Sequence, residues 1–113
     1  RMDKGAPSAE VLRVADLTLD QGARRVLVNG QEARLTPTEF DLLAAFMSAP
    51  GHVFSRQALL DQVQGTDSTS FDRAIDVHIR NLRIKIEPDP SHPRYIETVF
   101  GVGYRLCAES PEE

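Results

Sequence analysis

The spacing of the hydrophobic positions changes along the chain. Between Val11 and Leu35 these positions fall in short runs with strand-like patterning, which read LRV, LTLD, RVLV and QEARL. The Asn29-Gly30 pair between two of these runs is a strong hairpin signal, because both residues tolerate a positive φ. This segment therefore predicts a small antiparallel sheet of three or four strands.

Two helices are predicted after this sheet. Residues 36–39, TPTE, place a Thr at the N-cap, a Pro at the first helical position and a Glu at N3, which is the capping-box arrangement. Apolar positions then recur at helical spacing until Pro50 and the glycine after it, so this helix should end near Ala49. After a short extended piece, Ser55 can cap a second helix that runs from Arg56 to about Val63.

A third and longer helix is predicted from about residue 71 to residue 87, with the sequence FDRAIDVHIRNLRIKIE. At about 100° per residue, one narrow sector is apolar and should face the core. Its members are Ile75, Ile79, Leu82 and Ile86. The opposite sector holds Arg73, Val77, Arg80 and Ile84, flanked by Asn81 on one side and by Asp76, Arg83 and Glu87 on the other.

The mixed character of this opposite sector fits the major groove of DNA. Arginine can pair with both acceptors of guanine, asparagine suits the adenine edge, and an apolar side chain can touch a thymine methyl group. Taken alone, the pattern favours an ordinary surface helix with charge pairs four residues apart, such as Asp76 with Arg80. The neighbouring segment changes the interpretation. The sequence from about 95 to 106 predicts a strand, a Gly-Val-Gly turn and another strand, so we expect a hairpin directly after the helix.

Composition limits the class of protein. With 113 residues, 41% of them hydrophobic, the chain suits one domain with a modest core. No apolar run is long enough to span a membrane, so we expect a soluble, cytoplasmic domain. The three histidines are isolated from one another, the single cysteine cannot form an internal disulfide, and no nucleophile motif is present. The sequence thus predicts no metal site, no cofactor and no enzyme activity.

The net charge of −4 argues at first against a nucleic-acid partner, but its distribution weakens that objection. Residues 68–105 carry six basic and five acidic side chains, whereas residues 106–113 carry three acidic and no basic ones. The acidity therefore lies largely outside the predicted helix and hairpin. A local charge of +1 is still small, so we expect one copy to bind weakly and dimers or tandem sites to supply affinity.

Four blocks in the right order resemble one known family. They are LTPTEFDLL at 35–43, the Phe-Ser-Arg-x-x-Leu stretch at 54–59, DRAIDVHIRNLRIKIE at 72–87 and HPRYIETVFGVGYRL at 92–106. Together they resemble the OmpR/PhoB-type winged-helix effector domain of bacterial two-component response regulators. We expect this domain to cover residues 11–107, after a linker at 1–10 and before an acidic tail at 108–113.

The resemblance implies an α+β fold: an N-terminal four-stranded antiparallel sheet, a three-helix bundle and a C-terminal hairpin called the wing. It also implies sequence-specific binding to double-stranded DNA, with the helix at 71–87 in the major groove and the wing at 95–106 near the minor groove. The implied groove-facing residues are Arg73, Val77, Arg80 and Asn81. Arg83 is implied as a phosphate contact and Thr98 as a further contact to the DNA backbone.

Two positions depart from many relatives. Position 81 is Asn where many have a basic residue, which shifts base preference toward adenine or removes a phosphate contact. Position 100, at the wing turn, is Phe where some relatives place Arg, and Phe lacks the charge that draws Arg into a narrow minor groove. Whether Phe100 contacts DNA therefore stays open.

The resemblance also implies partners. Family members commonly bind direct repeats as head-to-tail dimers, and in some the loop matching residues 64–70 touches RNA polymerase. The family places a receiver domain upstream, which this chain does not contain, so any phosphorylation switch lies outside these residues. The alternative function is a winged-helix module that docks a protein on the exposed face of the long helix, without specific DNA readout.

Overall fold

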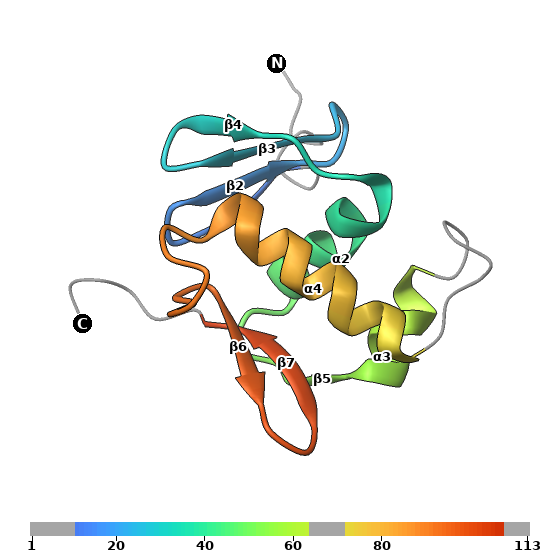
Figure 1. The fold of residues 1–113 in the computed structure, drawn as a ribbon. Helices are drawn as coiled ribbons and strands as arrows, with labels where there is room; N and C mark the ends of the chain where they lie inside the picture. The colour runs from blue at the N-terminus through green and yellow to red at the C-terminus, as the bar shows by residue number, and fades with distance from the viewer. Residues whose placement is uncertain (1–10, 64–71, 108–113) are drawn as a thin grey trace.

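The computed structural model describes residues 11–63 and 72–107. The predicted linker at 1–10, the loop at 64–70 and the tail at 108–113 lie outside the described residues. Figure 1 shows a sheet at one end of the molecule, a group of helices in the middle and a hairpin at the other end. This is the predicted α+β architecture, which is confirmed.

The N-terminal sheet is antiparallel, with four strands in the order of the sequence. They are β1 (Val11–Val14), β2 (Leu17–Asp20), β3 (Arg25–Val28) and β4 (Gln31–Ala33). The turn between β3 and β4 is the predicted Asn-Gly pair, in which Asn29 has a φ of 53° and Gly30 a φ of 87°. These values lie in the left-handed region that Asn and Gly tolerate better than other residues, which explains their place in the turn.

Helix α2 (Pro37–Ser48) begins at the predicted capping box. The Glu39 amide donates to Thr36 Oγ1 at 3.2 Å, and the Thr36 amide donates to Glu39 Oε1 at 3.0 Å. Both exchanged bonds satisfy amide groups that would otherwise lack a partner at the helix start. The helix ends at the predicted place, with Ala49 as its C-cap and Gly51 at a φ of 84° just beyond.

A short strand, β5 (Phe54–Ser55), leads into helix α3 (Arg56–Gln62), which Ser55 caps as predicted. The sequence indicated only an extended piece here, but the structure adds β5 to the C-terminal hairpin. That hairpin consists of β6 (Ile96–Val99) and β7 (Gly103–Leu106), and the three strands lie in the order β5, β7, β6. The wing is therefore one part of a three-stranded sheet.

Pairing with β5 gives Gly103 a role that differs from the predicted one. We interpreted both wing glycines as residues that permit a tight turn. Gly101 does so, with a φ of 81°. Gly103 instead lies opposite Ser55, where a Cβ atom would overlap the backbone carbonyl of Phe54. Glycine is needed at 103 because another backbone approaches closely.

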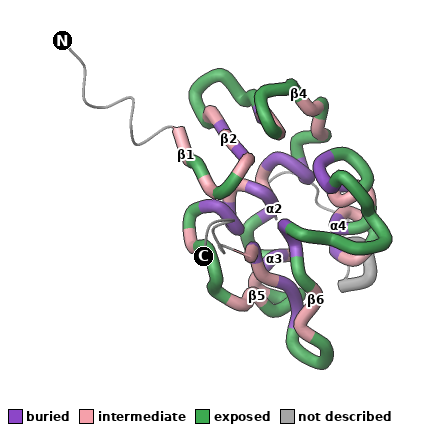
Figure 2. The backbone as a smooth tube through the Cα atoms, turned by 90° about the vertical axis from the view of Figure 1, so that its left-hand side faces the viewer, coloured by how far each residue is buried: buried purple, intermediate pink, exposed green. Residues whose placement is uncertain are grey.

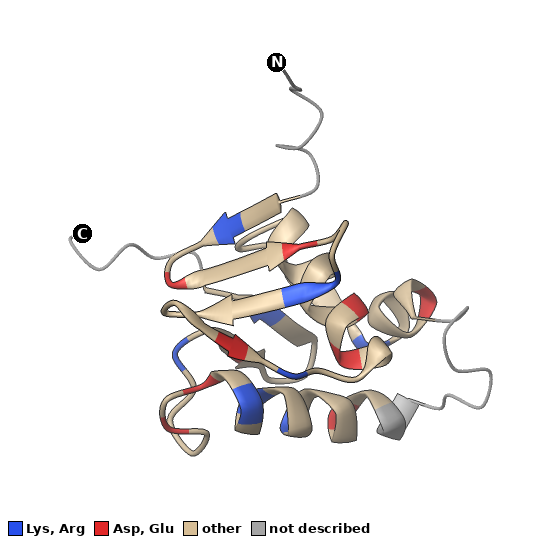
Figure 3. Ribbon diagram, turned by 90° about the horizontal axis from the view of Figure 1, so that it is seen from above, with Lys and Arg blue, Asp and Glu red and all other residues tan. Residues whose placement is uncertain are grey.

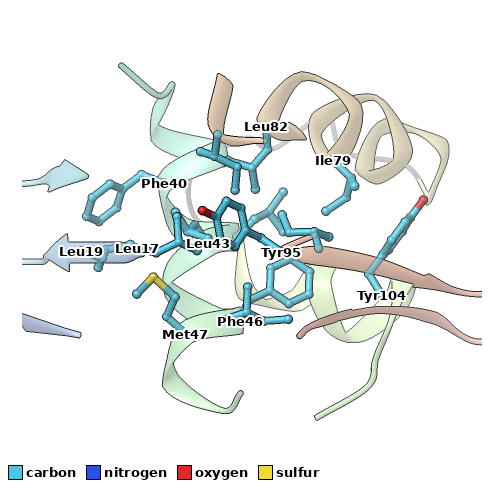
Figure 4. Close-up of a cluster of buried hydrophobic side chains, with 14 of the residues drawn as sticks. Leu17, Leu19, Phe40, Leu43, Phe46, Met47, Ile79, Leu82, Tyr95 and Tyr104 are labelled. Atoms are coloured by element: carbon cyan, nitrogen blue, oxygen red, sulfur yellow. The ribbon is translucent and has the colours of Figure 1, made fainter. Parts of the chain in front are cut away.

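Helix α4 (Asp72–Ile86) crosses the molecule between the two sheets and packs against both α2 and α3 (Figure 1). Its apolar sector and the inner faces of α2 and β2 meet in one core, whose side chains interdigitate in Figure 4. Figure 2 shows the buried positions along these elements, while the hairpin turn is exposed. The fully buried side chains include Leu17, Leu19, Phe46, Leu43, Leu59, Ile75 and Leu82.

Candidate nucleic-acid interface

The predicted core face of α4 is confirmed. Ile75, Ile79, Leu82 and Ile86 are each at most 2% exposed. Burial of this sector fixes the rotation of the helix and leaves the opposite sector facing outward. On that side Val77 is 51% exposed and Ile84 is 56% exposed. We call the surface formed by Val77, Arg80 and Ile84 the open face.

Arg80 is the cation of the open face. Its side chain is exposed, and within residues 11–63 and 72–107 it forms no ion pair. The charge pair of Arg80 with Asp76, which the surface-helix interpretation suggested, is not formed, because Asp76 binds other partners. Two nearby cations are engaged in ion pairs: Lys85 Nζ lies 2.7 Å from Glu39 Oε1, and Arg105 Nε lies 2.8 Å from Glu97 Oε1. Figure 3 shows the basic positions along α4.

Asp76 and Arg83 on one flank of α4, and Glu87 just beyond its end, form hydrogen bonds to α3 and to the hairpin segment. Expecting Glu87 at the edge of the exposed sector was wrong, since it is only 6% exposed. Its carboxylate accepts hydrogen bonds from the backbone amides of Arg94, Tyr95 and Ile96, at 2.7 to 3.1 Å. These bonds attach the residues that lead into β6 to the end of α4, because three successive amide groups, two of them buried, share one carboxylate acceptor.

Arg83 forms a second connection between α4 and the hairpin. Its Nη2 donates to the carbonyl oxygen of Ile96 at 2.9 Å and to Thr98 Oγ1 at 2.7 Å. Nε also donates to the Ile96 carbonyl at 3.2 Å, and the guanidinium lies 5.5 Å from the centroid of the Tyr104 ring. The two predicted backbone contacts, Arg83 and Thr98, are thus hydrogen bonded to each other.

Asp76 joins α4 to both α3 and β7. Its Oδ1 accepts a hydrogen bond from Arg56 Nε at 2.9 Å and one from the Tyr104 hydroxyl at 2.5 Å. Burial favours a higher pKa for the Asp76 carboxyl, but the hydrogen bonds from Tyr104 and Arg56 outweigh it and lower the pKa. The hydrogen bond to Asp76 likewise raises the pKa of Arg56. At neutral pH Asp76 is therefore a carboxylate that ties three elements together.

The structure brings some predicted site residues together and separates others. Val77 and Arg80 share the open face, and Asn81 is half-buried beside it. Arg73 belongs to α4, but its side chain lies outside the described residues. Phe100 occupies the hairpin turn, away from α4, and is 90% exposed (Figure 1). The predicted DNA-binding residues that the structure describes therefore fall at three places: the open face and its margin, the junction of α4 with the hairpin, and the hairpin tip.

Sequence reasoning missed the residues that position this surface. Asp76, Glu87 and Tyr104 were not identified as such, because their partners are distant in the chain. Asp76 bonds residues 20 and 28 positions away. A helix wheel compares only residues of one helix, so no pattern within α4 signals these contacts. The one available signal was a Glu at the very end of the predicted helix, just before Pro88.

The described residues contain no group of three or more His, Cys, Asp or Glu side chains able to hold a metal ion. None of the described helices is long and apolar enough to cross a membrane.

Comparison with known proteins identifies the family. Residues 30–106 match the family model described as "Transcriptional regulatory protein, C terminal". The DNA-binding response regulator MtrA of Mycolicibacterium paratuberculosis is 45% identical over 97 residues, which cover 86% of this chain and 43% of MtrA. The chain thus spans less than half the length of the curated relatives it matches.

Two solved structures extend the comparison to the fold. The DNA-binding domain of Klebsiella pneumoniae RstA, in complex with the RstA box, has a TM-score of 0.77 and 30% identity, covering 88% of this chain and 99% of that one. The response regulator DrrB of Thermotoga maritima, an OmpR/PhoB homologue, has a TM-score of 0.77 and 32% identity, covering 87% of this chain and 44% of DrrB. The chain therefore belongs to the family of C-terminal domains of transcriptional regulatory proteins, with the OmpR/PhoB-type winged-helix fold.

Proposed function

We propose that this domain binds duplex DNA in a sequence-specific manner and regulates transcription initiation as the output domain of a response regulator. The observation that carries the proposal is the open face of α4, on which an unpaired Arg80 lies between two exposed apolar residues among the described positions. A solvated helix face has no need of exposed Val and Ile, whereas a major groove offers both guanine acceptors and thymine methyl groups.

The base-reading roles follow from side-chain chemistry. Arg80 is placed to pair with the O6 and N7 acceptors of a guanine, and Val77 to touch a thymine methyl group. Asn81, at the margin of the open face, either reads an adenine edge or replaces a basic residue that would bind phosphate. Arg73 completes the set on sequence grounds alone. These residues act on a helix whose other two sides are fixed by the core and by the hairpin, so their positions are preorganised.

The backbone-binding roles belong to the junction of α4 and β6. Arg83 uses Nε and Nη2 for bonds to Ile96 and Thr98, and among the described residues its Nη1 has no hydrogen-bond partner. We propose that Nη1 of Arg83 and the Thr98 hydroxyl bind a phosphate of the DNA backbone that separates the major groove from the minor groove. Phosphate contacts of this kind fix the register of a protein on DNA without reading sequence.

The comparisons support duplex DNA as the partner. The RstA domain, which the chain matches over nearly its whole length, was solved in complex with its DNA box. MtrA is named as a DNA-binding response regulator. Since this chain spans only part of MtrA, an upstream receiver domain and control by phosphorylation are parts of the proposal. Such a domain would act in the cytoplasm, and binding rather than catalysis would be its role.

Further partners follow from the low charge and from the family. A charge of +1 over residues 68–105 favours weak binding by one copy, so we include head-to-tail pairing on direct repeats. Contact between residues 64–70 and RNA polymerase is retained as a proposal that rests on the resemblance alone, since this loop lies outside the described residues.

The direct test is selection of bound sequences from random duplexes at low salt, followed by gel-shift titration. We expect the enriched duplex to bind more tightly than random duplex, with an affinity that falls steeply as salt is raised. If the enriched duplex never binds more tightly than random duplex, the proposal of sequence-specific binding is overturned. The exposed Val77 and Ile84 would then favour the alternative, a docking surface for a protein.

A further inference from the structure

The tip of the hairpin is apolar and open to solvent. Phe100 is 90% exposed and Val102 is 51% exposed, although both are large hydrophobic residues. The residues of the tip, Val99 to Gly103, include no charged side chain. A charge cannot therefore attract this tip to the phosphates or to the negative potential of a minor groove. Binding by the side chains of the tip has to come from contact with an apolar or aromatic surface.

The tip is held on a firm base. Arg83 and Glu87 attach β6 to α4 through side-chain bonds to Ile96 and Thr98 and to the β6 backbone. On the other strand, Tyr104 donates to Asp76, and β7 also pairs with β5. Position 100 is thus fixed relative to the open face of α4. An exposed aromatic ring on a rigid support loses little conformational freedom when it binds.

The order of residues along the hairpin matches the order of features across duplex DNA. With α4 in the major groove, Arg83 and Thr98 lie at the proposed phosphate contact that borders the groove. Phe100 is two residues beyond Thr98, a reach of about 7 Å at roughly 3.3 Å per residue of strand. Beyond a phosphate strand that borders the major groove lies the minor groove, so this docking would bring the hairpin tip to the minor groove.

We propose that Phe100 is an apolar wedge that enters the minor groove and partly unstacks one base step. Proteins that bend DNA commonly insert Phe, Leu or Ile between base pairs in this way, and bend the duplex away from the wedge. The inference deepens the proposed function and rests on it. It makes Phe100 a specificity-determining residue through DNA deformability, because pyrimidine-purine steps such as TA and CA unstack most easily.

The test is a parallel selection from random duplexes with four chains: wild type, Phe100→Ala, Phe100→Leu and Phe100→Arg. Wild type and Phe100→Leu should enrich a TA or CA step at one fixed position outside the bases read by α4. Phe100→Ala should lose this enrichment and keep the α4 positions. Phe100→Arg should enrich a run of A and T instead, since arginine prefers the narrow minor groove of such runs.

Affinity and bending are then measured on the duplex enriched by wild type. Replacing its flexible step by a GC step should weaken wild-type binding about tenfold and leave Phe100→Ala nearly unaffected. End-to-end energy transfer should show a bend with wild type and Phe100→Leu that is smaller with Phe100→Ala. Because the side chain is exposed, thermal unfolding of all four chains should coincide.

Three results would overturn the wedge. Identical enriched sequences and equal bends for wild type and Phe100→Ala would reject it and leave the proposed function intact. An effect of Phe100→Ala only on duplexes with two sites would make Phe100 a contact between two protein copies. Failure of every chain, wild type included, to enrich any sequence would reject the proposed function and the wedge with it.

Discussion

At the scale of single residues, charged side chains of α4, together with Glu87 just beyond its end, divide into two groups. Asp76, Arg83 and Glu87 use their polar atoms within the protein, on α3 and on the hairpin. Arg80 has no such partner among the described residues. The first group positions the helix and the hairpin, with Nη1 of Arg83 left over among the described residues, whereas the whole guanidinium of Arg80 is available to a ligand. This division was hidden in the sequence, where all four look like surface charges of one helix.

Asp76 should make the stability of the fold depend on pH. Its pKa in the folded protein is lowered below the ordinary value of 3.8, so its contribution is complete above that value and is lost as pH falls through the lowered pKa. We expect Asp76→Asn to lower the free energy of unfolding by on the order of 1 kcal/mol at pH 7, since the carboxylate is partly exposed. Urea unfolding at pH 7 and pH 3 measures this.

The control for Asp76 is Glu32→Gln, a carboxylate at an exposed position of β4. The difference in stability between wild type and Asp76→Asn should shrink below about pH 4. A difference of the same size at pH 7 and pH 3 would show that the charge of Asp76 is not what stabilises the junction.

Arg83→Ala should weaken binding to all duplexes about equally and lower the slope of log affinity against log salt by roughly one, because one phosphate contact is lost. Thr98→Val is the matched control, since it removes a hydrogen bond to Arg83 and an uncharged phosphate contact but no charge. It should leave the salt slope unchanged. A loss confined to one base position in a substitution series would contradict the phosphate role of Arg83.

At the scale of elements, the wing is a strand pair fixed on two sides. β5 covers the β7 side, and the Arg83 and Glu87 bonds secure β6. The close approach of β5 leaves room only for glycine at 103. The hairpin therefore extends from the body of the protein as a rigid projection whose direction is set by α4.

Gly103→Ala should destabilise the fold more than Gly101→Ala does. At 101 there is open space around an added Cβ, so the cost is the positive φ, about 1 kcal/mol. At 103 the Cβ meets the Phe54 backbone, and β5 has to separate from β7, at a cost of more than about 2 kcal/mol. Urea unfolding of both variants measures this. Equal destabilisation by the two variants would show that β5 separates from β7 at little cost in free energy.

The sequence predicted those elements whose signals are local. The capping box of α2, the Asn29-Gly30 turn and the apolar sector of α4 all depend on residues within a few positions of one another. The pairing of β5 with β7 and the bonds of Asp76 join segments that are far apart in the chain, and nothing in either segment alone signals the other. For the same reason the wheel of α4 showed which face is buried but not that one flank faces a hairpin.

At the scale of the whole molecule, charge is distributed to favour weak and local binding. The net charge is −4, and five of the cations in the described part of the chain, Arg24, Arg25, Arg56, Lys85 and Arg105, are engaged in ion pairs. Non-specific attraction to phosphates should therefore be low, and specificity should depend on a few contacts in the grooves. A second copy on the same duplex would supply the missing affinity.

Two enriched sites arranged as direct repeats should bind two copies cooperatively. We expect cooperativity when the site centres are about one helical turn apart, roughly 10 to 10.5 base pairs, because both copies then lie on one side of the duplex. Inserting about 5 base pairs between the sites turns the second copy to the opposite side of the duplex and should abolish the cooperativity. Gel shifts that resolve one-copy and two-copy complexes measure this, and independent binding at every spacing would refute head-to-tail pairing.

The most direct test of the central claim, that the open face of α4 reads base sequence, is a base-by-base affinity series. Every single base-pair substitution of the enriched duplex is titrated with wild type and with Arg80→Ala. We predict that Arg80→Ala loses discrimination at one guanine, at a cost of about 1–3 kcal/mol, and keeps it at other positions. An equal loss at all positions, or no loss at any, would contradict the claim.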